Sequence, residues 1–254
     1  SVAVLFAMLV GQKRLSQLRG WSSSDVLRSA LFGFLNPFLY YFILFKAYAL
    51  LPAQEAQALN FIWPIVLVLC SMVFLKQQIA LKCVMAMMIS FIGVLVIATR
   101  GNMLALEFTH TTGVLLALGS ALIWAVYWIG NLNDSCDPVA RLFMNFVFGC
   151  VFVTGYVVLF DRIQMPSPQG LLGCLYVGLF EMGVTFLLWL KALQLSQTTD
   201  TVSGLIYISP FLSLVFIHFT VGESIFPSTV VGLALIVAGI MAQHGQRFTR
   251  SSLS

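Results

Sequence analysis

Four residues with polar or aromatic groups share one helical face inside a segment that is otherwise apolar. Gln57, Asn60, Phe61 and Pro64 follow the spacing i, i+3, i+4, i+7, so a helix would place them on one side. Because proline has no N–H, the carbonyl of Asn60, four residues earlier, would be left without its helical partner. This face would offer amide groups, a carbonyl and an aromatic ring at membrane depth. Polar packing between helices around a structural kink is the alternative interpretation.

A carboxylate is the second candidate for chemistry. Glu181 lies roughly midway along another apolar stretch, with Thr185 and Trp189 on the same helical face. A charged side chain in that position costs about 2.5–3.5 kcal/mol on membrane-insertion scales, which favours its protonated form. Glu181 could therefore take up and release a proton or bind an ammonium group. The alternative is a structural carboxyl group that is protonated and bonded to a neighbour.

Aromatic residues form a third candidate face. Trp124, Tyr127, Trp128 and Asn131 stand at i, i+3, i+4 and i+7. Their rings could stack on an aromatic or apolar solute while the N–H and O–H groups anchor its polar ends. A belt of aromatic residues at the membrane interface would give a similar pattern, and it fits Trp128 better than Trp124.

The elements that position these residues are membrane-spanning helices. The chain is 60% hydrophobic and 9% charged with a mean hydropathy of +0.98, whereas a soluble domain carries about 25% charged residues. Its apolar runs are about 20 residues long and continuous, which predicts an all-α integral membrane protein. We expect about nine spans, of which the first is a stub: 1–11, 28–50, 53–75, 79–99, 111–131, 139–160, 169–192, 199–221 and 224–243.

The distribution of basic residues predicts the orientation. Ten of the 13 Lys and Arg residues fall in loops on one side of the predicted membrane. Because cytoplasmic loops are enriched in Lys and Arg, we expect a multi-pass protein of the inner (plasma) membrane with a cytoplasmic C-terminus. Four charged residues near helix ends are expected to extend to the interface and are left out of the site: Lys46, Glu55, Lys191 and Asp200.

Other classes of function have no support in the sequence. The five Cys and three His have no metal-ligand or disulfide spacing. No loop is long enough for a soluble domain and no catalytic set is present, so we predict no enzyme activity, cofactor or metal. No basic patch suggests nucleic acid, which leaves a small-molecule substrate and the lipid bilayer as partners. The oligomeric state is not predicted.

An internal repeat predicts the architecture. Two pairs match at an offset of 145 and two at 146: Gly33 with Gly178, Lys46 with Lys191, Pro64 with Pro210, and Gly93 with Gly239. Five spans lie between equivalent helices, and because this number is odd, the halves have opposite orientations, as in many secondary transporters. We predict two inverted five-helix repeats, ten spans in the full protein. They cover 1–101, which lacks its first helix, and 102–246, before a cytoplasmic tail at 247–254. Chance similarity between apolar helices is the alternative.

Several motifs resemble those of a known family. They are Asn60-Phe61-Ile62-Trp63-Pro64, Ile123-Trp124-Ala125-Val126-Tyr127, Phe180-Glu181-Met182-Gly183 and Gly222-Glu223. The chain resembles the EamA family of the drug/metabolite transporter superfamily over nearly its whole length, and within it the aromatic amino acid exporters. Many members have Glu after the fourth helix of each half. Here the first half has Gln77 and only the second keeps Glu223.

The resemblance and the repeat imply a secondary transporter that exports small metabolites, with amino acids, including aromatic ones, as the expected class. Alternating access would operate through a central cavity, with Pro64 and Pro210 bending their helices. The repeat counterpart of Glu181 is Asn36. The predicted substrate-binding residues are Asn36, Tyr40, Gln57, Asn60, Trp63, Trp124, Tyr127, Glu181 and Tyr207. A non-transporting membrane scaffold or accessory subunit is the alternative.

Overall fold

The computed structural model describes residues 1–51, 56, 59–99, 101–102, 110–160, 167–209, 212 and 227–251 of the chain. The side chains at positions 19, 98 and 244–251 are outside this description. Two predicted site residues, Gln57 and Pro210, lie outside the described residues as well.

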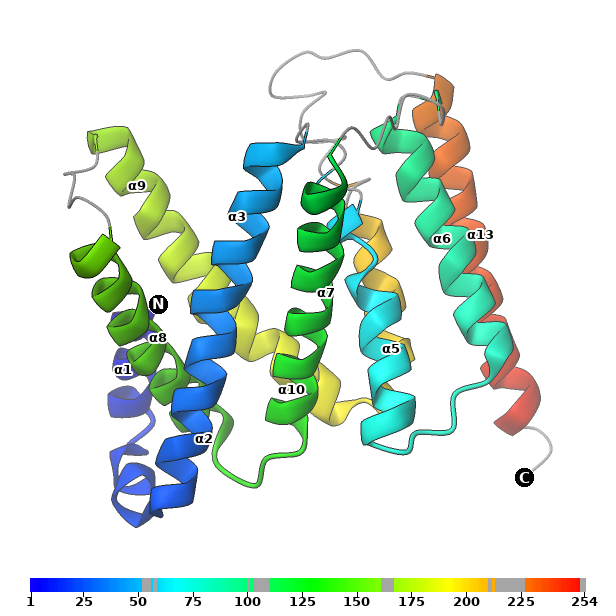
Figure 1. Ribbon diagram of the computed structural model, residues 1–254. Coiled ribbons are helices and arrows are strands. Elements are labelled where there is room, and N and C mark those ends of the chain that lie inside the picture. The colour runs from blue at the N-terminus through cyan, green and yellow to red at the C-terminus, as the bar shows by residue number, and fades with distance from the viewer. Residues whose placement is uncertain are drawn as a thin grey trace. The chain divides into compact units, whose positions relative to one another are not determined.

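The described part of the chain is built from helices (Figure 1). Four of them are long and apolar enough to cross a membrane: Ser23–Leu50, Thr111–Leu132, Pro138–Phe160 and Pro168–Leu195. Shorter apolar helices cover Val2–Gly11, Trp63–Phe74, Leu81–Ile97 and Pro227–Gln243. These positions confirm the prediction of an all-α membrane protein.

One predicted boundary was too late. The helix expected to begin at residue 28 begins at Ser23, because Ser22 caps it. The Ser22 side chain accepts a bond from the backbone N–H of Asp25, and the Asp25 carboxylate accepts one from the backbone N–H of Ser22. This reciprocal capping satisfies two N–H groups at the helix start and adds an amphipathic turn before the apolar run.

The chain divides into two compact units, each drawn from both ends of the sequence. Unit 1 comprises Ser1–Phe42 and Tyr127–Leu195, and unit 2 comprises Ile43–Val126 and Ser196–Ser254. Both units therefore contain helices from both predicted repeats, so the compact units differ from the halves of the sequence. The predicted repeat boundary at residue 101 stays a prediction.

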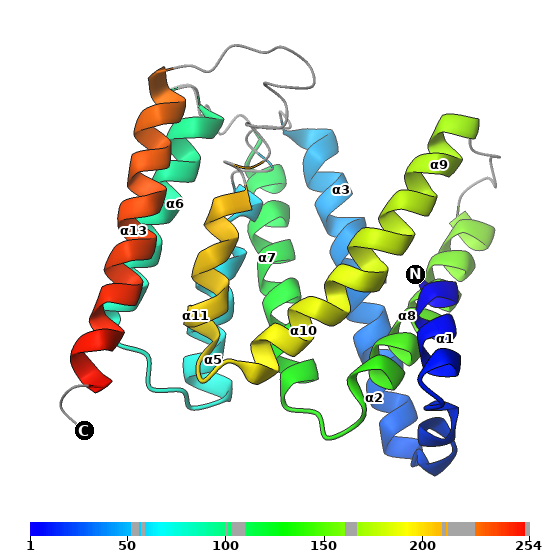
Figure 2. The ribbon, with the colours of Figure 1, turned by 180° about the vertical axis from the view of Figure 1, so that it is seen from behind.

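Unit 1 is organised around the long helix α8. Its elements are α1 (Val2–Gly11), η1 (Leu15–Gly20), α2 (Ser23–Gly33), η2 (Phe34–Leu39), α8 (Pro138–Phe160), α9 (Pro168–Tyr176), η4 (Val177–Thr185) and α10 (Phe186–Leu195). The helices α1 and α2 both pack against α8 (Figure 2). A Cβ atom at Gly33 would lie 2.8 Å from the backbone nitrogen of Gly149, so this helix crossing requires glycine.

Two helices are shared between the units by residue number. The first part of α3 (Tyr40–Leu50) belongs to unit 1 and the rest to unit 2, while α7 (Thr111–Leu132) contributes its beginning to unit 2 and its end to unit 1. The other elements of unit 2 are α5 (Trp63–Phe74), α6 (Leu81–Ala98), α11 (Thr199–Ser203), η5 (Gly204–Tyr207) and α13 (Pro227–Ser251).

Within unit 2, α6 and α13 pack along their length as an antiparallel pair (Figure 1). A Cβ at Gly93 would lie 2.5 Å from the carbonyl oxygen of Gly232 and 2.9 Å from Ile236. A Cβ at Gly239 would lie 2.6 Å from the carbonyl oxygen of Ala86. At the repeat offset of 146, Gly239 is the counterpart of Gly93 and Gly232 is the counterpart of Ala86. The contact is therefore reciprocal, as two inverted copies of one helix require.

Candidate functional site

Two helices of unit 1 are irregular at equivalent positions of the repeat. The segment η4 is π-helical and carries Glu181, whereas η2 is a helix kink that carries Asn36, the repeat counterpart of Glu181. Asn36 has extended backbone angles, with φ −150° and ψ 121°. Short π-helical segments interrupt the regular hydrogen bonding of a helix and occur frequently at functional sites. Both irregularities therefore fall on residues whose chemistry suggested binding.

Glu181 lies on the surface of unit 1, not in its interior. Its Oε1 accepts a hydrogen bond from the hydroxyl of Tyr41, 3.3 Å away. The ring of Tyr41 in turn meets the predicted site residue Tyr40 edge to face, with centroids 4.9 Å apart. Tyr41 is not among the predicted site residues, although its place next to Tyr40 was the available signal. The Tyr41 hydroxyl thus orients one carboxylate oxygen of Glu181.

Asn36 is fully buried in unit 1. Neither its amide nitrogen nor its amide oxygen has a hydrogen-bond partner among the described residues. A buried polar group without a partner costs about 1–3 kcal/mol, so such a group in a folded protein needs an explanation. The predicted binding role of Asn36 is one such explanation.

Two aromatic residues of the predicted face on α7 lie in the interior. Tyr127 and Trp128 are both fully buried in unit 1. Trp128 packs edge to face on Phe186, with centroids 5.2 Å apart, so it belongs to the protein interior and not to an interfacial belt. Tyr127 meets Phe32 in the same manner at 6.1 Å. A solute could contact Tyr127 only after this packing opens, and its predicted role stays a prediction.

In unit 2, α5 with the residues just before it and α7 bring predicted site residues together. The Asn60 amide donates to the Ser120 hydroxyl over 3.1 Å. One turn further along each chain segment, the rings of Trp63 and Trp124 meet at 65° with centroids 5.9 Å apart. Asn60, Trp63 and Trp124 are all partly exposed, which leaves ring surface and amide atoms that a solute could reach.

Pro64 lies in the first turn of α5, where its missing N–H is tolerated. The chain is helical at Leu59 and Asn60, turns at residues 61–62 and resumes as α5 at Trp63. The helix interruption thus falls where the proline was expected to cause it. That the helix bends there during transport stays a prediction.

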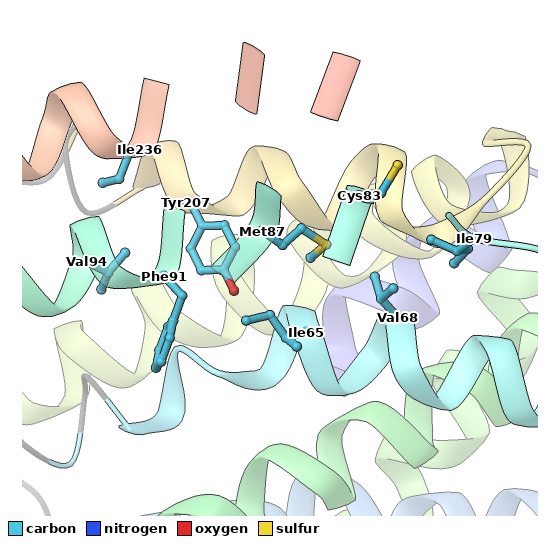
Figure 3. Packing of buried hydrophobic residues seen from close by; sticks show 9 residues of the cluster. All are labelled: Ile65, Val68, Ile79, Cys83, Met87, Phe91, Val94, Tyr207 and Ile236. Atoms are coloured by element: carbon cyan, nitrogen blue, oxygen red, sulfur yellow. The ribbon is translucent and has the colours of Figure 1, made fainter. Parts of the chain in front are cut away.

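Tyr207 lies inside unit 2 rather than on a polar surface (Figure 3). It is fully buried in a cluster whose other members are apolar, namely Ile65, Val68, Ile79, Cys83, Met87, Phe91, Val94 and Ile236. Its hydroxyl has no hydrogen-bond partner among the described residues, and neither has that of Ser203 one turn earlier. The predicted contact of Tyr207 with substrate would require this cluster to open.

A buried charge cluster in unit 1 was missed. The Arg141 side chain is 1% exposed and lies 2.9 Å from a carboxylate oxygen of Asp134 and 3.3 Å from one of Asp25. It also donates to the Ser29 hydroxyl over 2.8 Å and to the Cys136 sulfur over 3.0 Å. Arg141 contributes only to the prediction of membrane orientation. The spacing of Asp25 and Ser29, one turn apart on one helix, was the available signal.

Asp134 lies in the loop between α7 and α8, and its side chain is 2% exposed. Burial opposes ionisation of this carboxyl group. The backbone N–H of Cys136 and the charge of Arg141 outweigh that effect and lower its pKa below the usual value. The ionised form is therefore the one that the fold stabilises.

A second missed cluster lies in unit 2. Asp200 is 2% exposed, and its backbone oxygen accepts a hydrogen bond from the Gln243 amide. Next to it, the Gln77 side-chain oxygen accepts bonds from the backbone N–H and the hydroxyl of Thr199, at 3.0 and 3.1 Å. The expectation that Asp200 extends to the interface is wrong, because α13 covers it. Lys191, assigned the same behaviour, is exposed.

Among the described residues, no group of three His, Cys, Asp or Glu could hold a metal ion. The groups that could bind a solute act by hydrogen bonds, ion pairs and ring contacts. Unit 1 offers the exposed carboxylate of Glu181 with the Tyr41 phenol. Unit 2 offers the Asn60 amide with the indole rings of Trp63 and Trp124.

Comparisons with known proteins identify the family. The family described as "EamA-like transporter family" matches residues 1–99 and 111–242, and its members are transporters and not enzymes. The "Uncharacterized transporter YvbV" of Bacillus subtilis is 27% identical over 242 residues, 93% of this chain and 77% of that protein. The "Aromatic amino acid exporter YddG" of Ancylobacter novellus is 24% identical over 208 residues, 80% of this chain and 70% of that protein.

A solved crystal structure has the same fold. It superposes with a TM-score of 0.79 at 22% identity, over 95% of this chain and 83% of that one. The fold and the family that the sequence motifs predicted are both confirmed. This chain belongs to the EamA-like transporter family of membrane proteins.

Proposed function

We propose that this protein is a secondary transporter that exports amino acids, including aromatic ones, across the plasma membrane by alternating access. The observation that carries the proposal is the place of Glu181. It is an exposed carboxylate on the apolar 28-residue helix Pro168–Leu195, at a π-helical irregularity.

The position of Glu181 restricts what its side chain can face. A charge in the bilayer centre costs about 2.5–3.5 kcal/mol on insertion scales, so its helix face must meet water or polar groups. Tyr41 donates one hydrogen bond to Glu181. Because an ionised carboxylate has about four acceptor positions, others remain for the ammonium group of an amino acid.

The aromatic pair of unit 2 independently favours solutes with rings. Trp63 and Trp124 are partly exposed and meet edge to face. An aromatic side chain can add to such a pair, with a gain of about 0.5–1.5 kcal/mol beyond area burial. The relative named an aromatic amino acid exporter is consistent with this class of substrate.

The remaining predicted residues would act in another conformation. Asn36, Tyr40, Tyr127 and Tyr207 are buried in this structure. Alternating access moves groups of helices against one another as a cavity closes on one side and opens on the other, and we propose that these residues become accessible in that change. We also propose that the C-terminus is cytoplasmic, because ten of 13 basic residues fall on its side.

The test is transport by the purified full-length protein in proteoliposomes, with radiolabelled phenylalanine, leucine and serine. In the variant Glu181→Gln, we expect the KM for all three to rise at least about tenfold, because loss of a charge-assisted hydrogen bond costs about 1.5–3 kcal/mol. Lys191→Gln removes an exposed charge from the same helix and should leave the KM unchanged.

Trp124→Ala separates the aromatic preference from general binding. Phenylalanine transport should fall several-fold more than serine transport, since only the ring uses the indole pair. A wild-type protein that moves none of the three amino acids would overturn the proposal and point to a membrane scaffold. An unchanged KM in Glu181→Gln would remove Glu181 from the site.

A further inference from the structure

Unit 1 has four carboxylates that the structure describes, and three of them are neutralised by arginine. The ion pairs, with N–O distances of 2.5–3.4 Å, are Arg14–Asp137, Arg28–Asp134, Arg141–Asp25 and Arg141–Asp134. The fourth carboxylate is Glu181, which takes part in none of these pairs. Among the described residues of unit 1, its negative charge is therefore the one without a cationic partner.

The basic side chains of unit 1 are placed away from Glu181. The three paired arginines gather with the three aspartates. Of the two lysines in the described part of this unit, Lys13 directly precedes Arg14. Lys191 follows Glu181 by ten residues on the same helix, about 15 Å along its axis at a rise of 1.5 Å per residue.

The polar side chains that the structure places next to Glu181 carry no charge. The Tyr41 hydroxyl donates to its Oε1 over 3.3 Å, and the ring of Tyr41 meets that of Tyr40 edge to face. Thr185 follows Glu181 by four residues and is exposed, so it lies on the same side of the helix. A hydroxyl group can accept a hydrogen bond as well as donate one. The site therefore combines one full negative charge with neutral hydrogen-bonding groups.

A primary ammonium group complements such a site. It carries one positive charge and three N–H donors, which match the acceptor positions of a carboxylate and a neighbouring hydroxyl. Hydrogen bonds between two ionised groups are also the stronger ones. The ammonium group of a bound solute would thus supply the cation that Glu181 lacks among the described residues.

A carboxylate on the same solute is not matched in this way. In a zwitterionic amino acid it is attached to the carbon that carries the ammonium group, so it would stand close to Glu181. Like charges repel about four times as strongly at the effective dielectric constant of a protein as in bulk water. The charge pattern around Glu181 therefore favours a solute whose only charge is its ammonium group.

We propose that the site at Glu181 recognises the ammonium group alone, and that aromatic primary amines without a carboxylate are ligands of this protein. Such an amine binds at least as tightly as the amino acid with the same side chain. The inference rests on the proposed role of Glu181 in binding an ammonium group. It adds organic monocations to the class of solutes that the protein binds.

The test is direct binding to the purified full-length protein in detergent micelles, measured by isothermal titration calorimetry. Four ligands share a phenyl ring on a two-carbon chain and differ in charge. Phenethylamine is a cation, phenylalanine a zwitterion, 3-phenylpropionate an anion and 2-phenylethanol a neutral molecule. Because the ring is constant, differences in Kd report how the site responds to charge.

The Kd of phenethylamine should be no higher than that of phenylalanine. The Kd of 3-phenylpropionate should be at least about tenfold higher than that of phenethylamine, a difference of about 1.4 kcal/mol. Phenylalanine that binds more tightly than phenethylamine would overturn the inference, because a cation of the protein would then hold the ligand carboxylate. This comparison uses the wild-type protein and depends on no variant.

Glu181→Gln keeps the shape of the side chain and removes its charge. The Kd of phenethylamine should rise at least about tenfold in this variant, as loss of a charge-assisted bond predicts, while that of 2-phenylethanol stays the same. The unchanged 2-phenylethanol value also shows that the variant is folded. Lys191→Gln, which removes the exposed cation of the same helix, is the matched control and should leave both values unchanged. An unchanged phenethylamine Kd in Glu181→Gln would refute the assignment to this carboxylate.

Transport in proteoliposomes separates the inference from the proposed function. A protein that carries phenylalanine but binds it more tightly than phenethylamine would keep the proposed function and overturn the inference. A protein that binds phenethylamine through Glu181 but carries none of the amino acids would support the inference and overturn the proposed substrate.

Discussion

Arg141→Leu is expected to be the most destabilising single change among the polar residues of unit 1. The substitution leaves a shorter, apolar side chain and removes the cation that lies 2.9 Å from Asp134. Asp134, whose side chain is 2% exposed, would then be left with Arg28 at 3.4 Å as its remaining ion-pair partner in the described cluster. Ser29 would also lose its guanidinium donor.

The magnitude follows from burial. Removing one partner of a buried ion pair costs about 3–5 kcal/mol, because the other charge remains without compensation. Since Arg28 still faces Asp134, we expect the low end, about 3 kcal/mol of unfolding free energy. Arg14→Gln breaks the pair of Arg14 with Asp137, whose side chains are 42% and 14% exposed, and should cost less than about 1 kcal/mol.

The assay is reversible unfolding of the purified protein by SDS in mixed micelles, followed by far-UV circular dichroism. A double variant, Arg141→Leu with Asp134→Leu, replaces the charged pair by apolar side chains and should recover at least about 1 kcal/mol of the loss. An Arg141→Leu protein within about 1 kcal/mol of the wild type would refute the reasoning, because Asp134 would then have found water or another partner.

Two further predictions concern pH and packing. Because folding lowers the pKa of Asp134, its ionised form stabilises the protein above the unfolded-state value of about 4, and this stabilisation is lost as the pH falls below it. Asp134→Asn should therefore show a smaller loss of unfolding free energy between pH 6 and pH 3 than the wild type, and an equal loss would contradict the prediction. Gly93→Ala inserts a methyl group 2.5 Å from the Gly232 carbonyl oxygen and should destabilise by about 1–3 kcal/mol. Gly119→Ala, with no atom within 4 Å of the new methyl group, should stabilise α7 by up to about 1 kcal/mol. Similar values for the two glycine variants in the same SDS titration would show that α6 and α13 are not closely packed.

The sequence predicted the helices well because their signals are local. The span expected at 111–131 is Thr111–Leu132, and the one expected at 139–160 is Pro138–Phe160. The break before α5 was equally local, since a proline cannot complete a helical hydrogen bond wherever its helix packs. Gly93 and Gly239, paired by the repeat offset, both lie in the contact between α6 and α13, although the offset did not predict that these helices pack on each other.

Contacts between helices could not be predicted, because spacing along one helix does not say which face another helix meets. Arg141 was read as a loop cation, yet Asp25 and Asp134 surround it from two other segments. Asp200 was placed at the interface, although α13 covers it with Gln243. For the same reason, an aromatic side chain such as Tyr127 looks identical in sequence whether it faces a solute or a packed interior.

The contact between α6 and α13 has a consequence for redesign of the protein. Gly93 of α6 contacts Gly232 and Ile236 of α13, and Gly239 of α13 contacts Ala86 and Ser90 of α6. Each helix therefore places an equivalent glycine against the backbone of the other. Replacing the contact residues of one helix with those of its repeat counterpart should therefore give two helices with identical contact faces that still pack. Two copies of one such helix would then pack on each other through the contacts that α6 and α13 already make.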